Sequence, residues 1–173
     1  MRAARYSRRQ MRSGPLVLVN RQHPLAEEPR QLLTAADERY PNILLERQAA
    51  RLLAACVQAV RGAGAIVPVS GWRSQAEQQQ IWDDTLRTEG EAFTRQYVAL
   101  PGCSEHQTGL ALDINTASRS AHFETTATYR WLIENCWRYG FILRYPEGRE
   151  DITGFCFEPW HYRFVGRTLA LQV

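Results

Sequence analysis

The chain has 173 residues, a length that suits one domain with a single hydrophobic core. Its apolar fraction of 45% argues against disorder throughout, and a formal net charge of +3 gives no reason to assign a nucleic-acid partner. Arginines are concentrated in the first dozen residues. We expect residues 1–14 to form a basic tail, either solvated or touching an anionic polymer or membrane, and residues 15–173 to form one domain.

The N-terminal end has the basic start of a signal peptide but not its apolar segment, because the run 15–19 is too short. No run approaches the roughly 20 apolar residues of a membrane span. We therefore expect no membrane span and a cytoplasmic protein. A membrane-anchored, extracytoplasmic protein is the alternative if the natural chain is longer. The four cysteines form no C-x-x-C pair, which disfavours a thiolate zinc site and fits a reducing compartment.

The first half of the sequence predicts two short strands and three helices. Apolar spacing and Gly or Pro breaks give this order: a strand at 16–19, irregular structure at 20–45, a helix at 46–61, a strand at 65–69, and helices at 75–88 and 92–97. Gly62 and Gly64 are expected to end the first helix. Ser74 and Glu77 form a capping-box pattern, which predicts that the second helix begins at residue 75.

The second half begins with a strand, in which Leu110, Leu112 and Ile114 alternate with smaller or polar residues. These three side chains should face the core, while Asp113 shares the opposite face with Ala111. The further predicted elements are a helix at 126–139, strands at 141–145 and 154–157, and a short helix from residue 166. Because regular crossover helices do not separate most strands, we predict an α+β fold with a small, mainly antiparallel sheet flanked by helices.

Two histidines and one aspartate are candidate metal ligands: His106, Asp113 and His161. Two nitrogens, one oxygen and an open position are the ligand set of a hydrolytic zinc site. A carboxylate beside apolar neighbours, as at Asp113, is costly unless it is paired or metal-bound. Glu158 precedes His161 by three residues and could take a proton from water. The alternatives are ordinary hydrogen-bonded histidines, or a catalytic thiol at one of the cysteines near these motifs, Cys103 and Cys156.

Three motifs in the same order resemble the zinc D-alanyl-D-alanine carboxypeptidase family. Residues 104–113 read S-x-H-x-x-G-x-A-x-D, residues 158–163 read E-P-W-H-Y-R, and residues 70–74 read S-G-W-R-S. Trp72 stands where tyrosine is commoner in the family. This family includes vancomycin-resistance carboxypeptidases, bifunctional dipeptidase/carboxypeptidases and L,D-carboxypeptidases. The resemblance spans roughly residues 17–167.

The resemblance implies that His106, Asp113 and His161 bind one Zn²⁺ per chain on the sheet, and that Glu158 is the general base and acid. Residues three apart point to opposite faces of a straight strand. We therefore expect Pro159 to mark a bend or strand end that lets Glu158 and His161 reach the same ion.

Four further residues have implied roles at the substrate. Arg73 would stabilise the oxyanion, although it could also be a surface ion-pair partner. Ser104 would bind the terminal carboxylate of the substrate, or merely cap a loop. Gln78 would bind a substrate amide or carboxylate, or be exposed. Trp160 would form a pocket wall, or belong to the core.

The implied function is that of a zinc metallopeptidase, a D,D-carboxypeptidase/D,D-dipeptidase that removes terminal D-Ala from peptidoglycan precursors and cleaves D-Ala-D-Ala. Such an activity would serve glycopeptide resistance or cell-wall turnover. The alternatives are an L,D-carboxypeptidase and a non-catalytic zinc-stabilised binding module, which would need neither Glu158 nor Arg73. The expected partners are small peptides ending in D-Ala, with no nucleic acid and no obligate protein partner.

Overall fold

A four-stranded antiparallel sheet lies at the centre of the computed structural model, which describes residues 14–25, 27, 33–60 and 66–173. Its strand order is β3 (Val67–Ser70), β4 (Ala111–Asn115), β6 (His161–Phe164) and β5 (Phe141–Leu143). A separate antiparallel pair joins β1 (Leu33–Ala35) to β2 (Leu44–Glu46). The expected basic tail lies outside the described residues except for Gly14, and so do Gly62 and Gly64.

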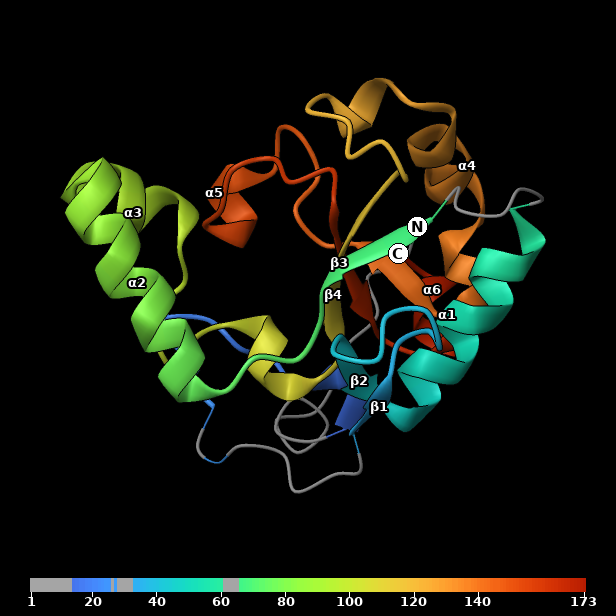
Figure 1. Cartoon of the computed structure of the whole chain (residues 1–173), viewed down its shortest axis with the longest axis horizontal. Helices are drawn as coiled ribbons and strands as arrows, with labels where there is room; N and C mark the ends of the chain where they lie inside the picture. The colour runs from blue at the N-terminus through green and yellow to red at the C-terminus, as the bar shows by residue number, and fades with distance from the viewer. Residues whose placement is uncertain (1–13, 26, 28–32, 61–65) are drawn as a thin grey trace.

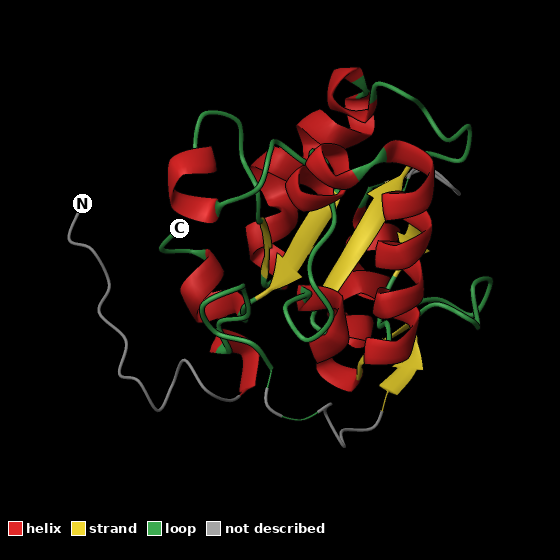
Figure 2. Ribbon diagram, turned by 90° about the vertical axis from the view of Figure 1, so that its left-hand side faces the viewer, coloured by secondary structure: helices red, strands yellow, loops and turns green. Residues whose placement is uncertain are grey.

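Helices lie on both sides of this sheet (Figures 1 and 2). The α-helices are α1 (Arg47–Ala59), α2 (Gln75–Glu89), α3 (Glu91–Tyr97), α4 (Ala127–Asn135), α5 (Glu150–Thr153) and α6 (Arg167–Ala170). The 3-10 helices are η2 (Gly14–Leu16), η3 (Glu105–Thr108), η4 (Phe123–Thr125) and η5 (Cys136–Tyr139). No helix among the described residues is both long and apolar enough to cross a membrane.

The hydrophobic core lies between the sheet and the helices α1 and α4, which are on the right of Figure 1. The predicted inward-facing aliphatics of β4 are all buried there, with Leu112 at 0% exposure. Cys56 of α1 and Cys136 of η5 belong to the same cluster, as predicted for two small core residues. The helices α2 and α3 lie on the opposite side of the sheet.

Most predicted helices are confirmed. The helix α2 begins at residue 75 behind the reciprocal capping bonds of Ser74 and Glu77. The helix predicted over 126–139 is divided, because α4 gives way to the tighter η5 before Gly140 ends it in a left-handed conformation. These positions follow from local spacing and capping, which depend little on distant residues.

Three predictions for strands and loops are wrong. The strand predicted at 16–19 is absent: Leu16 ends η2, and the Val17 carbonyl accepts a hydrogen bond from the Arg163 side chain. The segment predicted to be irregular contains the β1–β2 hairpin. Residues 154–157 are not a strand, because α5 ends at Gly154 and the edge strand β5 pairs with β6 instead. The strand β6 itself was not predicted.

Candidate active site

Neighbouring strands bring distant residues together at the polar face of the sheet. Asp113 on β4 is the register partner of His161 on β6 and of Ser70 on β3. Residues directly opposite each other on antiparallel strands share a face, with Cβ atoms about 4.5–5.5 Å apart. His106 comes from η3, which ends at Gly109 in a left-handed turn (φ 71°) before β4 begins. The sheet register therefore gathers residues that are up to 91 positions apart, from 70 to 161.

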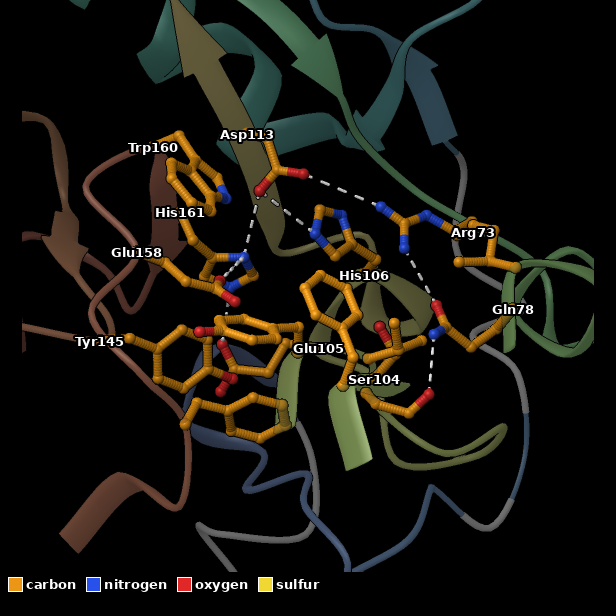
Figure 3. Close-up of a pocket in the computed structure, with 16 residues that line it drawn as sticks. Arg73, Gln78, Ser104, Glu105, His106, Asp113, Tyr145, Glu158, Trp160 and His161 are labelled. Atoms are coloured by element: carbon orange, nitrogen blue, oxygen red, sulfur yellow. Dashed lines mark hydrogen bonds and ion pairs between the residues drawn. The ribbon is translucent and has the colours of Figure 1, made fainter. Parts of the chain in front are cut away.

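The three predicted ligands present donor atoms to one another. His106 Nε2 lies 3.4 Å from Asp113 Oδ1, and His161 Nδ1 lies 3.2 Å from the same oxygen (Figure 3). All three donors lie within 4.8 Å of one another. Donors bound at about 2.0–2.1 Å to one tetrahedral zinc would be about 3.3 Å apart. The residues and their spacing therefore fit a zinc ion.

His106 is oriented by the loop that follows β3. Its Nδ1 lies 2.7 Å from the Gly71 carbonyl oxygen, so Nε2 is directed at Asp113. A Cβ at Gly71 would overlap the Leu44 carbonyl oxygen, which explains why the chain needs glycine there. The Arg73 amide donates to the His106 carbonyl at 3.3 Å. The S-G-W-R-S motif thus fixes the predicted metal ligand His106 in position, and it also places Arg73 at the site.

Glu158 and His161 reach the site through a tight turn. The His161 amide donates to the Glu158 carbonyl at 3.1 Å, which closes a turn across Pro159 just before β6. The predicted bend is therefore present, and Glu158 Oε2 lies 3.7 Å from His161 Nδ1. Burial raises the pKa of the Glu158 carboxyl to about 7, with Asp113 adding to the rise and His161 opposing it. A bound cation would favour its ionised form.

Arg73 lies at the rim of the ligand group, fixed by polar partners. Its Nη2 donates to Ser70 Oγ at 2.8 Å and lies 3.8 Å from Asp113 Oδ2. Its Nη1 donates to Gln78 Oε1 at 3.0 Å, and Gln78 Nε2 donates to the Ala99 carbonyl at 2.8 Å. Gln78 is 1% exposed, so the alternative of simple exposure is wrong for it.

A pocket of about 420 Å³ contains all the predicted site residues. Ser104 is buried in its wall, and its side chain makes no capping hydrogen bond to η3, so the alternative of a loop cap is wrong. Trp160 is 40% exposed at the pocket edge, which excludes the core alternative. The apolar part of the lining comes from α2, α3 and nearby loops: Ile81, Phe93, Tyr97, Val98 and Phe155.

Neither of the two cysteines near the motifs is among the described residues that line this pocket. Cys103 is buried, and burial raises the pKa of its thiol, which disfavours the nucleophilic thiolate. Cys156 accepts a hydrogen bond from Gln96 at 3.0 Å. The geometry therefore gives no support to the alternative of a thiol mechanism.

Sequence reasoning missed Glu105, which lies between two residues that it did select. Glu105 is 4% exposed and contacts His161, Arg144 and Arg163. Burial would raise the pKa of its carboxyl, but Arg163, His161 and Arg144 outweigh burial and hold it below the usual range. The only signal in the sequence was an acidic residue inside a motif. The Tyr145 ring, also missed, lies 4.8 Å from the His161 ring.

The carboxylates make this site favourable for positive charge. Burial would lower the pKa of His161, but hydrogen bonds to Asp113 and Glu105 raise it to about 9. Burial would raise the pKa of Asp113, but His106 and His161 hold it well below the usual range. An ionised Asp113 between two imidazoles is the electrostatic setting that a divalent cation requires.

A family model for D-alanyl-D-alanine carboxypeptidases, VanY, matches residues 42–167, which include every predicted site residue. The chain belongs to the VanY family. A curated relative is the bifunctional D-Ala-D-Ala dipeptidase and D-Ala-D-Ala carboxypeptidase VanXYC of Enterococcus gallinarum. It is 39% identical over 87% of this chain and 83% of its own length.

Several solved structures of similar proteins match the fold. The vancomycin-resistance D,D-dipeptidase VanXYg, solved with a D-Ala-D-Ala phosphinate analogue, is 40% identical with a TM-score of 0.88, over 95% of this chain and 67% of its own. A VanB-type D,D-pentapeptidase VanY E175A mutant, solved with Zn(II), is 36% identical with a TM-score of 0.78. The match covers 91% of this chain and 92% of the mutant's own. The L,D-carboxypeptidase LdcB is 37% identical with a TM-score of 0.78, and the match covers 91% of this chain and 79% of its own.

The sequence prediction of a VanY-type enzyme is thereby confirmed at the level of family, α+β fold, carboxypeptidase class and zinc as cofactor. The role of each side chain in this chain is a separate question. It depends on the distances and partners described above.

Proposed function

We propose that this chain is a zinc-dependent D,D-carboxypeptidase and D,D-dipeptidase, which removes terminal D-Ala from peptidoglycan precursor peptides and cleaves D-Ala-D-Ala. The observation that carries this proposal is the convergence of three metal donors, Glu158 and Arg73 in one pocket (Figure 3). Relatives named for both reactions support it. Relatives named for vancomycin resistance support a role in glycopeptide resistance, with cell-wall turnover as the alternative.

His106, Asp113 and His161 would hold the zinc through Nε2, a carboxylate oxygen and Nδ1, the atoms that face one another. When bound, zinc supplies Lewis-acid activation of water and of the scissile carbonyl. Three protein ligands leave a fourth position open, as a catalytic rather than a structural site requires.

Glu158 moves the proton. Its Oε2 lies at the edge of the ligand group and is not needed to complete it. The carboxylate takes a proton from the attacking water and delivers it to the leaving amine of D-Ala. The ionised carboxylate can accept the proton of the water, and the protonated carboxyl can then release that proton to the amine.

Arg73 stabilises the negative charge that develops on the carbonyl oxygen of the substrate. Its guanidinium is already oriented by Ser70 and Gln78, so little reorganisation accompanies the reaction. Gln78 thus acts chiefly by positioning Arg73. Ser104 is buried in the pocket wall and would bind the terminal carboxylate of the substrate, while Trp160 closes one edge.

An L,D-carboxypeptidase is the second candidate, because LdcB has nearly the same similarity to this chain as the zinc-bound VanY. The two candidate activities would share the zinc site, the general base Glu158 and the charge-stabilising Arg73. They differ only in the stereochemistry of the residue before the scissile bond. A non-catalytic binding module is disfavoured, since it would have no use for Glu158 and Arg73 beside the ligands. The cytoplasmic location stays a prediction.

The test is an amino-acid release assay on three substrates in parallel: D-Ala-D-Ala, the pentapeptide precursor and the L,D-tetrapeptide. We expect D-Ala release from the first two and little from the third. Release from the tetrapeptide alone would replace the D,D assignment with the L,D one. A zinc-loaded protein that releases nothing from any of them would favour the binding module.

A further inference from the structure

Glu105 is a buried carboxylate that lies behind His161. Its side chain is 3% exposed, and its Oε2 lies 3.4 Å from His161 Nε2 (Figure 3). The other oxygen, Oε1, accepts a hydrogen bond from Arg144 Nε at 2.8 Å and lies 3.2 Å from Arg163 Nη1. The two oxygens therefore face different partners, the arginines on one side and the imidazole on the other.

The two arginines fix the position of Glu105. Arg163 is 2% exposed, and its Nη2 donates to the Val17 carbonyl at 2.8 Å, so its guanidinium is held from behind. Arg144 completes the pair from the strand end after β5. A buried carboxylate is costly unless its charge is compensated. Because both guanidinium groups approach Oε1, Oε2 remains directed at His161.

The two histidine ligands use opposite ring nitrogens, and each has an acceptor behind it. His161 directs Nδ1 at Asp113, 3.2 Å away, and Nε2 at Glu105. His106 does the reverse, with Nε2 towards Asp113 and Nδ1 at the Gly71 carbonyl. A neutral imidazole carries one proton, and the acceptor behind the ring determines which nitrogen keeps it. The nitrogen on the other side is then free to bind a metal.

We propose that Glu105 is a positioning residue for zinc binding. It accepts the Nε2 proton of His161, which fixes the tautomer and the ring orientation that present Nδ1 to the ion. This inference rests on the proposed ligand set. Carboxylates behind metal-binding histidines generally raise metal affinity by orienting the ring and strengthening the ligand. A purely structural Glu105 would need only its contacts with Arg144 and Arg163.

The first test compares the zinc dissociation constants of folded apoproteins, measured by competition with a chromogenic chelator. We expect Glu105→Gln to bind zinc about 10–100-fold more weakly than the wild type. The substitution preserves shape, but the amide has one oxygen, which the arginines attract. Its NH₂ group then faces His161 Nε2 and favours the tautomer with the proton on Nδ1, the wrong one for zinc.

A matched control separates positioning from loss of stability. Leu132→Ala creates a cavity in the core, where Leu132 is 1% exposed, and Leu132 is not among the described residues that line the pocket. We expect it to lower the thermal midpoint of the apoprotein while leaving the zinc dissociation constant within about twofold. If the affinities of Leu132→Ala and Glu105→Gln fell together in proportion to stability, Glu105 would be structural and the proposal would be overturned.

His161→Ala distinguishes failure of this inference from failure of the proposed function. Unchanged zinc affinity in His161→Ala would remove the ligand assignment on which both depend. A large loss in His161→Ala, with wild-type affinity in folded Glu105→Gln, would overturn the role of Glu105 alone.

A measurement on the wild-type protein covers the case in which Glu105→Gln does not fold. Long-range ¹H–¹⁵N correlation spectra of the zinc-loaded protein report which ring nitrogen carries the proton. We expect His161 to be protonated at Nε2 and metal-bound at Nδ1. A proton on Nδ1, with Nε2 as the ligand, would contradict the proposal.

Discussion

The two faces of β4 are built on opposite principles. Leu112 and Ile114 face a core of aliphatic and aromatic side chains, where the favourable contribution is removal of apolar surface from water and does not depend on direction. Asp113, between them in sequence, faces two imidazoles and a guanidinium, each at a defined distance. The apolar face therefore tolerates changes that preserve volume. The polar face depends on the positions of individual atoms.

This contrast leads to a division of effects. Changes on the apolar face should alter the stability of the protein and leave its chemistry intact. Changes on the polar face should alter metal binding or turnover. Burying the ionisable groups there costs stability, so these groups serve the chemistry of the site and do not stabilise the fold.

The largest effect is expected for His161→Ala. Removing one of three ligands should reduce zinc affinity by more than the ~10–100-fold typical of losing an outer partner, and activity should fall to background. Metal analysis of protein purified without chelators measures the occupancy. Chelation of the wild type should abolish activity, and added zinc should restore it. Full zinc occupancy in His161→Ala would show that the ligand assignment is wrong.

The next effect is expected for Arg73→Lys, which keeps the charge but removes the planar fork that contacts Ser70 and Gln78. We expect kcat to fall by ~10²-fold, the scale on which a lost oxyanion contact acts, with little change in zinc content. Steady-state kinetics on D-Ala-D-Ala provides the measurement. An unchanged kcat in the lysine variant would return Arg73 to the role of an ordinary ion-pair partner.

On the apolar face, Leu132→Ala should lower the free energy of unfolding by about 2–5 kcal/mol. Below its melting range, the variant should retain kcat and zinc affinity, because the cavity lies across the sheet from the pocket. Urea unfolding and kinetics on the same preparation test this. A matching drop in kcat would mean that the two faces are coupled and that the division drawn above fails.

The smallest effect concerns the thiols. Burial raises the pKa of Cys56 to about 12 and that of Cys136 to about 11, so neither provides much thiolate at pH 8. Iodoacetamide should label half-buried Cys156 first and leave activity nearly unchanged, as mass spectrometry and assay can show. Urea-unfolded protein is the control in which all thiols react. Inactivation that follows labelling of Cys156 would revive a thiol mechanism.

Local patterns predicted the elements that local physics determines. The α2 start follows from the Ser74–Glu77 capping box, and the inward face of β4 follows from strict alternation around Leu112. The ligand types and the need for a bend at Pro159 were also visible, because motif and residue chemistry determine both. The sequence did not show which ring nitrogen of His161 faces Asp113, since that depends on the register between β4 and β6.

The strand β6 shows why the remaining elements were missed. All four of its residues are buried, including His161 and Arg163, so its polar residues do not mark a solvent face. Glu105, from a segment more than 50 residues earlier, contacts both and so offsets part of the cost of burying them. A sequence shows that a charge is present, but it does not show which distant charge compensates it.

The central claim is that metal binding and proton transfer belong to different side chains. It is tested most directly by turnover of Glu158→Gln, measured with zinc content and fold verified on the same sample. We expect full zinc loading, nearly unchanged peptide binding by calorimetry and a ~10²–10⁴-fold lower kcat, because only the general base is lost. A folded, zinc-loaded Glu158→Gln enzyme with near-normal turnover would contradict the mechanism, and loss of zinc would make Glu158 a ligand instead.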